Sequence, residues 1–233
     1  MGTDNLTETL AGTVAVLFDF DGPLCDVFAG RPAPEVAREL ALLAASTDPA
    51  LSAKLSETDD PLEVLRLTHA ANPELGLRVE EALTAAEVEA VAVAGEPTPG
   101  AVAALEAVRA AGRKIAVVSN NSGESVRVFL GRHDLAEHVL EVVGRAERQP
   151  DLMKPNPHSL LKAAELLEVD VTLCALIGDS LTDIQAAHKV GAAAIGYANK
   201  PHKHQTFTEA GAEAVTEDMQ AIADAIQPPQ SND

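Results

Sequence analysis

Aromatic residues are scarce in this chain. Its 233 residues include no tryptophan, one tyrosine and five phenylalanines, so aromatics make up only 3% of the sequence. The hydrophobic fraction of 46% is ordinary, so the core must be packed closely from Ala, Leu and Val. The two cysteines, Cys25 and Cys174, are too few for a disulfide framework. We therefore expect reduced thiols and a cytoplasmic protein.

Basic residues are also few. The sequence has 17 Lys and Arg residues and 36 Asp and Glu residues, which gives a formal net charge of -19 at pH 7. Such a chain repels nucleic acid and anionic membranes, and we expect neither as a partner. An anionic substrate would need local positive charge or a metal ion. No apolar run approaches the roughly 18–20 residues of a membrane span, and the segment 1–8 has no pattern typical of a signal peptide.

From residue 97 onward, apolar runs alternate with helical patterns. Such alternation predicts a mostly parallel sheet with helices on both faces, which is a Rossmann-like three-layer α/β core. Helices are expected at 98–112, 122–132, 156–168 and 181–190. The expected strands are a first one at 14–18 and four more at 114–119, 139–144, 171–179 and 192–197.

The segment 26–96 differs in character from the rest of the chain. It contains five prolines, helical patterns between them and no convincing strand. This composition predicts a small helical domain inserted after the first strand. We therefore divide the chain into a core domain, residues 1–25 and 97–233, and an α-helical cap domain, residues 26–96.

Two aspartates follow the first predicted strand. Side chains alternate along a strand, so Asp19 and Asp21 would point the same way. Two carboxylates at the end of a buried strand are costly unless they are paired, and Mg²⁺ prefers oxygen ligands. The same residues also fit a solvated turn, because Asp-Gly is a common turn dipeptide.

Other polar residues follow the neighbouring strands, and a parallel sheet gathers them at one edge. They are Ser119 and Asn120, Asp179 and Asp183, and Lys154, which precedes a predicted helix. Individually they fit a helix cap, a helix-dipole partner or a surface lysine. Together they suit phosphoryl transfer, in which carboxylates hold Mg²⁺, a lysine balances phosphate charge and one carboxylate attacks phosphorus.

These residues resemble the four motifs of the haloacid dehalogenase superfamily of phosphohydrolases. The motifs occur in the family's order: Asp-x-Asp-Gly-x-Leu at 19–24, a Ser that closes the next strand at 119, Lys-Pro at 154–155 and Gly-Asp-x-x-x-Asp at 178–183. The helical insert resembles the family's first-type cap, near the phosphoglycolate phosphatase-like branch. Pro23 departs from the Thr or Val of many relatives and removes one amide donor.

The resemblance implies a role for each residue of the motifs. Asp19 would be the nucleophile that forms an aspartyl-phosphate, and Asp21 would donate and retake a proton. Lys154 would be a third catalytic residue that offsets negative charge. Phosphate binding would fall to Ser119, Asn120 and Gly22. Mg²⁺ would be held by Asp19, the carbonyl of Asp21, Asp179 and Asp183.

The resemblance implies a Mg²⁺-dependent phosphatase that acts on a small phosphate monoester, such as phosphoglycolate or a sugar phosphate. Asp21 favours ester chemistry, because dehalogenases of the superfamily lack an acid there. Two alternatives stay open: a phosphosugar mutase with the same aspartates, and a catalytically idle protein that binds a phosphometabolite. The expected partner is a small phosphorylated metabolite, and the protein is expected to be a monomer or a homodimer.

Substrate selection is expected in the cap. Arg31, in the loop that joins the core to the cap, is the first candidate to bind a second anionic group of the substrate. Arg66, His69 and Arg78 are weaker candidates, and Gly30 and Gly95 are possible hinges. The segment 202–204, His-Lys-His, is predicted to be a solvent-exposed loop.

Overall fold

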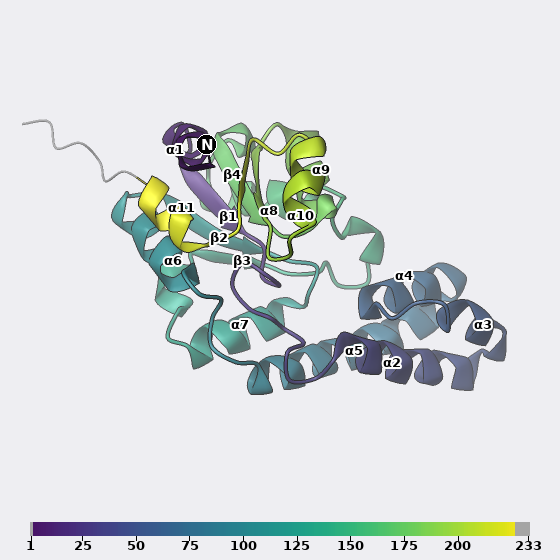
Figure 1. Cartoon of the computed structure of the whole chain (residues 1–233). Coiled ribbons are helices and arrows are strands. Elements are labelled where there is room, and N and C mark those ends of the chain that lie inside the picture. The colour runs from purple at the N-terminus through teal and green to yellow at the C-terminus, as the bar shows by residue number, and fades with distance from the viewer. Residues whose placement is uncertain (1, 227–233) are drawn as a thin grey trace, which may run out of the picture.

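The computed structural model describes residues 2–226 and contains one sheet of six parallel strands (Figure 1). Their order across the sheet is β3-β2-β1-β4-β5-β6. The first strand, β1, lies near the centre of the sheet. The chain then adds β2 and β3 on one side of it and β4, β5 and β6 on the other. The strands are β1 (Ala15–Phe18), β2 (Lys114–Val118), β3 (Glu141–Val143), β4 (Cys174–Gly178), β5 (Ala193–Tyr197) and β6 (Ala214–Thr216).

Helices cover both faces of the sheet, because successive strand residues point to opposite sides. In β1, Val16 and Phe18 belong to one hydrophobic cluster, and Ala15 and Leu17 belong to the other. One face carries α1 (Gly2–Ala11), α6 (Ala101–Ala110), α7 (Gly123–Arg132) and α11 (Gln220–Ala225). The other carries α8 (His158–Leu167), α9 (Leu181–Val190) and α10 (Lys203–Glu209).

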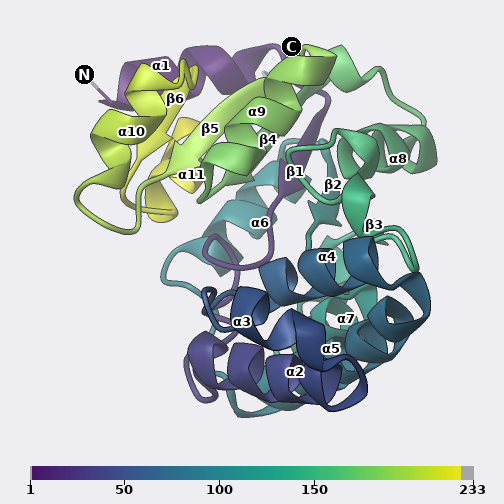
Figure 2. The same ribbon diagram turned by 90° about the vertical axis from the view of Figure 1, so that its right-hand side faces the viewer.

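The segment between β1 and α6 forms a separate group of helices with its own hydrophobic cluster. Both views place these helices at the carboxyl ends of the strands, opposite α1 (Figures 1 and 2). Asp60 and Asn72 cap α4 and α5 through their side chains. The cap helices are α2 (Ala33–Thr47), α3 (Ser52–Leu55), α4 (Pro61–Ala71) and α5 (Pro73–Val93).

The last turns of α5 leave the cap cluster. Ala90 and Val91 pack in the core cluster together with residues of α7, and Arg132 of α7 donates hydrogen bonds to the carbonyls of Val91 and Ala94. Helix α5 therefore starts among the cap helices and ends on the core, so it fixes one side of the cap to the sheet domain.

The three-layer α/β fold predicted from the sequence is confirmed, with differences at the edges. The strand expected at 171–179 begins at Cys174, because Val171–Leu173 form a 3₁₀ turn capped by Asp170. The sixth strand, β6, was not predicted, since three residues give no readable alternation. Helices α1, α10 and α11 were also not predicted. No helix in the described part of the chain is long and apolar enough to cross a membrane.

Phe129 provides a test of the core packing in a protein with few aromatic residues. Its buried ring lies edge-on to Phe20, with 5.5 Å between ring centroids. We expect Phe129→Ala to lower the free energy of unfolding by about 3–5 kcal/mol, because the cavity cannot close fully. Val128→Ala, at an exposed position of the same helix, should change it by less than about 0.5 kcal/mol. Urea denaturation measures both, and equal effects would contradict this packing.

Candidate active site

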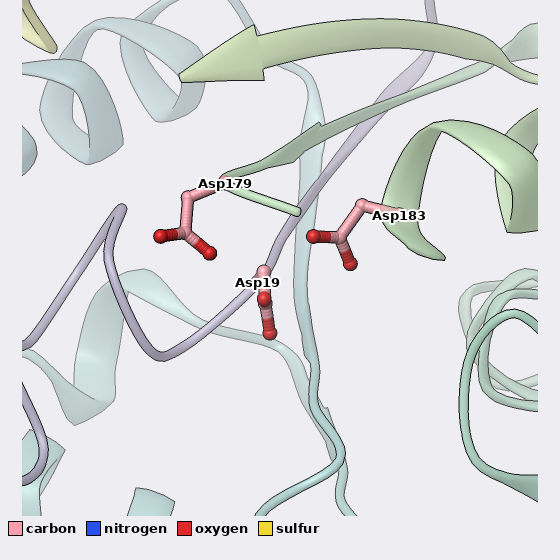
Figure 3. Close-up of side chains that lie close together, drawn as sticks. All are labelled: Asp19, Asp179 and Asp183. Carbon is pink, nitrogen blue, oxygen red and sulfur yellow. The ribbon is translucent and has the colours of Figure 1, made fainter. Parts of the chain in front are cut away.

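Three carboxylates meet beyond the central strands (Figure 3). Asp19 follows β1, Asp179 follows β4, and Asp183 lies in the first turn of α9. One carboxylate oxygen from each residue lies within 4.8 Å of the other two. Because β1 and β4 are neighbours, with Phe18 beside Ile177, the sheet register brings the first two residues together.

The carboxylate of Asp183 is held by the start of its own helix. Ser180 and Asp183 form a capping box: the Asp183 amide donates to Ser180 Oγ, and the Ser180 amide donates to Asp183 Oδ2 at 3.0 Å. This bonding leaves Asp183 Oδ1 facing the other acids. One side chain therefore caps α9 and also places an oxygen in the acidic cluster.

Lys154 is the buried cation of the cluster. Its Nζ lies 2.8 Å from Asp19 Oδ1 and 2.6 Å from Asp183 Oδ1, and it donates to the carbonyl of Val118 at 3.1 Å. Burial opposes its charge, but the carboxylates of Asp183 and Asp19 outweigh burial and raise the pKa of the ammonium group. Burial, and next the charge of Asp183, hold the pKa of Asp19 well above its ordinary value. Lys154 alone therefore leaves the cluster short of positive charge.

The donor set fits a Mg²⁺ ion. Three carboxylates from different elements offer hard oxygen ligands, which are the ligands this ion takes. Two glycines give these acids room: a Cβ on Gly22 would lie 2.5 Å from Asp179 Cγ, and a Cβ on Gly178 would lie 2.4 Å from Asp183 Cγ. Gly22 also has φ of 101°, which other residues rarely adopt.

Asp21 lies beside this cluster at the boundary between core and cap. Its Oδ1 accepts a hydrogen bond from the amide of Val27 at 3.1 Å. Burial raises the pKa of Asp21 to about 6, against the lowering effect of that hydrogen bond. Asp21 lines the same pocket as Asp19 and Asp179, so the pair Asp19 and Asp21 borders one space rather than a solvated turn.

The loop after β2 bears the predicted phosphate-binding residues. Ser119 Oγ accepts from the amide of Asn121 at 3.0 Å. Asn120 is bonded to Lys154 twice: its Oδ1 accepts from the Lys154 amide at 2.8 Å, and its Nδ2 donates to the Lys154 carbonyl at 3.3 Å. The Lys154 segment and this loop therefore hold each other in place.

A pocket of about 540 Å³ lies between these core residues and the cap. Its core side includes Asp19, Asp21, Asn120, Lys154 and Asp179. The cap side is mostly apolar, with one basic residue, Arg66, among the described residues that line it. Its other cap-side members are Phe28, Ala33, Pro34, Pro61, Leu62, Leu83 and the acids Asp59, Asp60 and Glu87.

Two of the predicted phosphate- or substrate-binding residues are placed differently. The guanidinium of Arg31 forms ion pairs with Glu39 and Glu89, away from the pocket lining, because both acids lie on neighbouring cap helices. The amide of Gly22 donates to the carbonyl of Cys25 at 2.7 Å. The Gly22 amide is therefore bonded within its own loop, and the position requires glycine because a side chain would meet Asp179.

Lys203 and Asn199 are site residues that the sequence did not reveal. Lys203 Nζ lies 2.7 Å from Asp179 Oδ2, and Asn199 Nδ2 donates to the same oxygen at 3.0 Å. The predicted loop at 202–204 is wrong for Lys203 and His204, which begin α10. His202 and His204 are exposed as expected, whereas Lys203 is half-buried. The sequence held no signal for this contact, because it depends on how α10 packs beside β5.

The fold and the site together define an α/β enzyme with an acidic centre under a helical cap. Residues 13–191, more than half of the chain, match the sequence model of haloacid dehalogenase-like hydrolases. The chain belongs to this family of hydrolases, as its motifs predicted.

Individual relatives agree with this assignment. A phosphoglycolate phosphatase of Neisseria meningitidis is 29% identical over 191 residues, which cover 78% of this chain and 79% of the relative. One from Rhodospirillum rubrum is 31% identical over 139 residues, and the match spans 57% of this chain but only about half, 54%, of that relative's length. The solved β-phosphoglucomutase of Clostridium difficile shares the fold, with a TM-score of 0.64 at 18% identity over 89% of this chain and 92% of that one.

Gly22 allows a direct test of the acidic cluster. In Gly22→Ala the new methyl group would displace Asp179 and strain the backbone. We expect the affinity for Mg²⁺, measured by isothermal titration calorimetry, to fall at least about tenfold. Gly12→Ala is the control, since its Cβ would meet nothing within 4 Å. Unchanged Mg²⁺ binding by Gly22→Ala would show that Asp179 is not a ligand.

Proposed function

We propose that this protein is a Mg²⁺-dependent phosphatase that hydrolyses a small phosphate monoester through an aspartyl-phosphate on Asp19. One observation carries the proposal: Asp19 borders a capped pocket, bonded to a buried lysine and grouped with two further carboxylates. Asp19, Asp179 and Asp183 would hold the metal ion with the carbonyl of Asp21. When bound, Mg²⁺ supplies positive charge to the phosphate oxygens.

The residues of the site divide the reaction between them. Asp19 forms a bond to phosphorus as the ester P–O bond breaks, and Asp21 donates a proton to the leaving alcohol oxygen. Asp21 then removes a proton from the water that cleaves the aspartyl-phosphate. Lys154 keeps its charge throughout, because Asp183 and Asp19 raise its pKa, and it balances the negative charge that collects around Asp19.

The size of the pocket favours a small ester, and Arg66 is its cap-side residue that could meet a second polar or anionic group of the substrate. A volume of about 540 Å³ fits a small metabolite above the phosphate. Arg66 of α4 reaches across from the cap and donates to the carbonyl of Lys154 at 3.1 Å. We therefore place Arg66, rather than Arg31, opposite the carboxylate of phosphoglycolate or the polar end of a sugar phosphate. The cytoplasmic location and the choice between monomer and homodimer stay predictions from the sequence.

Phosphate release from a panel of small esters tests the proposed activity. We expect turnover with Mg²⁺, no turnover with EDTA, and a loss of at least about 10³-fold in Asp19→Asn, because an amide cannot serve as the nucleophile. Asp134→Asn is the matched control, since this aspartate is exposed and its φ of 56° suits asparagine.

Two results would contradict this mechanism: hydrolysis that persists in EDTA, and full activity in Asp19→Asn. Release of free phosphate without a bisphosphate activator distinguishes a phosphatase from a phosphosugar mutase. Binding of phosphorylated ligands without turnover across the panel would indicate the idle binding protein.

Arg66 provides the test of substrate selection. We expect Arg66→Ala to raise KM for carboxylated esters about tenfold, since an ion pair at a partly desolvated site contributes roughly 1–2 kcal/mol. Arg78→Ala removes an exposed cap arginine that bonds to Thr47 and should leave KM unchanged. Arg31→Ala should also leave it unchanged. A rise in KM for Arg31→Ala with none for Arg66→Ala would reverse the assignment.

A further inference from the structure

A fully buried ion pair joins the cap to the core beside the pocket. Glu87 of α5 is 0% exposed, and the side chain of Arg145, which follows β3, is 1% exposed. The two guanidinium nitrogens of Arg145 lie 2.9 Å and 3.4 Å from the two carboxylate oxygens of Glu87. The pair therefore has the forked geometry that favours arginine over lysine.

Glu87 also accepts hydrogen bonds from the predicted phosphate-binding loop. Asn121 Nδ2 donates to its Oε1 at 3.2 Å, and the amide of Ser122 donates to its Oε2 at 2.9 Å. Ser119 Oγ donates a hydrogen bond to Asn121 Oδ1 at 3.2 Å, and the backbone amide of Asn121 donates to Ser119 Oγ. A continuous series of contacts thus links Arg145, Glu87, Asn121 and Ser119.

Arg145 holds the same loop from the other side. Its side chain donates to the carbonyl of Asn120 at 3.0 Å, and its backbone amide donates to the carbonyl of Asn121 at 2.8 Å. A second contact with α5 comes from its donation to Thr84 Oγ1 at 3.0 Å. The loop is therefore bonded to both members of the ion pair.

A buried ion pair is weak evidence for stability by itself, because well-packed apolar residues of similar size are often as stabilising. Both residues are instead hydrogen-bonded to the loop at residues 120–122, which indicates a role in positioning that loop. We propose that Glu87 and Arg145 are positioning residues, which hold residues 119–122 in the phosphate-binding shape only while α5 is docked on the core. The inference rests on the proposed function in one respect, namely that this loop binds phosphate.

The proposal makes phosphate binding depend on the position of a cap helix. If α5 moves away, Asn121 and Ser122 lose their acceptor Glu87, and Arg145, which donates to the carbonyl of Asn120, loses its bonds to Glu87 and Thr84. Glu87 and Arg145 then act on the substrate through the loop, and not by touching the reacting atoms.

The test compares binding of inorganic phosphate with thermal stability. In Glu87→Gln the side chain keeps its size but has one acceptor oxygen for the two loop donors, Asn121 Nδ2 and the Ser122 amide, and for the guanidinium of Arg145. We expect calorimetry in the presence of Mg²⁺ to show a Kd for phosphate about tenfold higher than that of the unaltered protein, and kcat for an accepted ester to fall more than KM rises. Glu89→Gln, on an exposed acid of the same helix that pairs with Arg31, should leave both unchanged.

Paired apolar substitutions separate positioning from stability. Arg145→Met leaves the buried Glu87 carboxylate without its cation, and Glu87→Met leaves Arg145 with Glu80 alone, whose Oε1 lies 3.5 Å from Arg145 Nε. Both variants should lower Tm. The double variant removes both charges, so its Tm should rise above those of the single variants, whereas its Kd for phosphate stays at least tenfold raised. If the single variants do not fold, Glu87→Gln decides the question.

The outcomes separate this proposal from the proposed function. Phosphate affinity that recovers with Tm in the double variant would overturn it, and so would unchanged phosphate affinity in Glu87→Gln. A protein that binds phosphate in this pattern but hydrolyses no ester would support the positioning role while the phosphatase proposal failed. If the protein hydrolyses esters while Glu87→Gln binds phosphate normally, the phosphatase proposal stands and the positioning role is overturned.

Discussion

The active site depends on one buried ammonium group. Lys154 Nζ lies between Asp19 and Asp183, and without it two buried carboxylates would face each other at a strand end, which is costly unless a proton or a cation neutralises them. The same residue is bonded through its backbone to Asn120, so it also positions the loop after β2. Lys154 therefore links the two buried carboxylates of the cluster to the loop after β2, through its side chain and its peptide groups.

The sequence predicted the core of the site because its residues follow strands, and parallel strands end at one edge. Asp19 and Asp179 needed only that rule to be placed together, and Lys154 lies at the same edge because it precedes the helix that leads back to β4. Contacts made by packed helices left no such signal: Lys203 looks like a solvated lysine in the sequence, and Glu87 is one of many acids on helical faces. Their partners lie 24 and 58 residues away along the chain, so only tertiary packing reveals them.

The cap combines a surface that lines the pocket with a helix that is attached to the core. Its helices α2 to α4 pack on their own hydrophobic cluster and present an apolar face and Arg66 to the pocket. Helix α5 instead ends in the core, where Arg132 bonds to the carbonyls of its last turn. The pocket therefore has one side formed by residues at the sheet edge and another formed by the cap, and α5 packs against both domains.

Asp183 serves the fold and the site with different oxygens. Oδ2 completes the capping box that starts α9, and Oδ1 faces Lys154. A descendant of this protein that abandoned catalysis would still need the helix, so selection for folding would keep the aspartate after selection for chemistry had ended. The presence of this residue in a distant homologue is therefore a weak indicator of catalytic activity. Asp19 is a better indicator, because its carboxylate caps no helix.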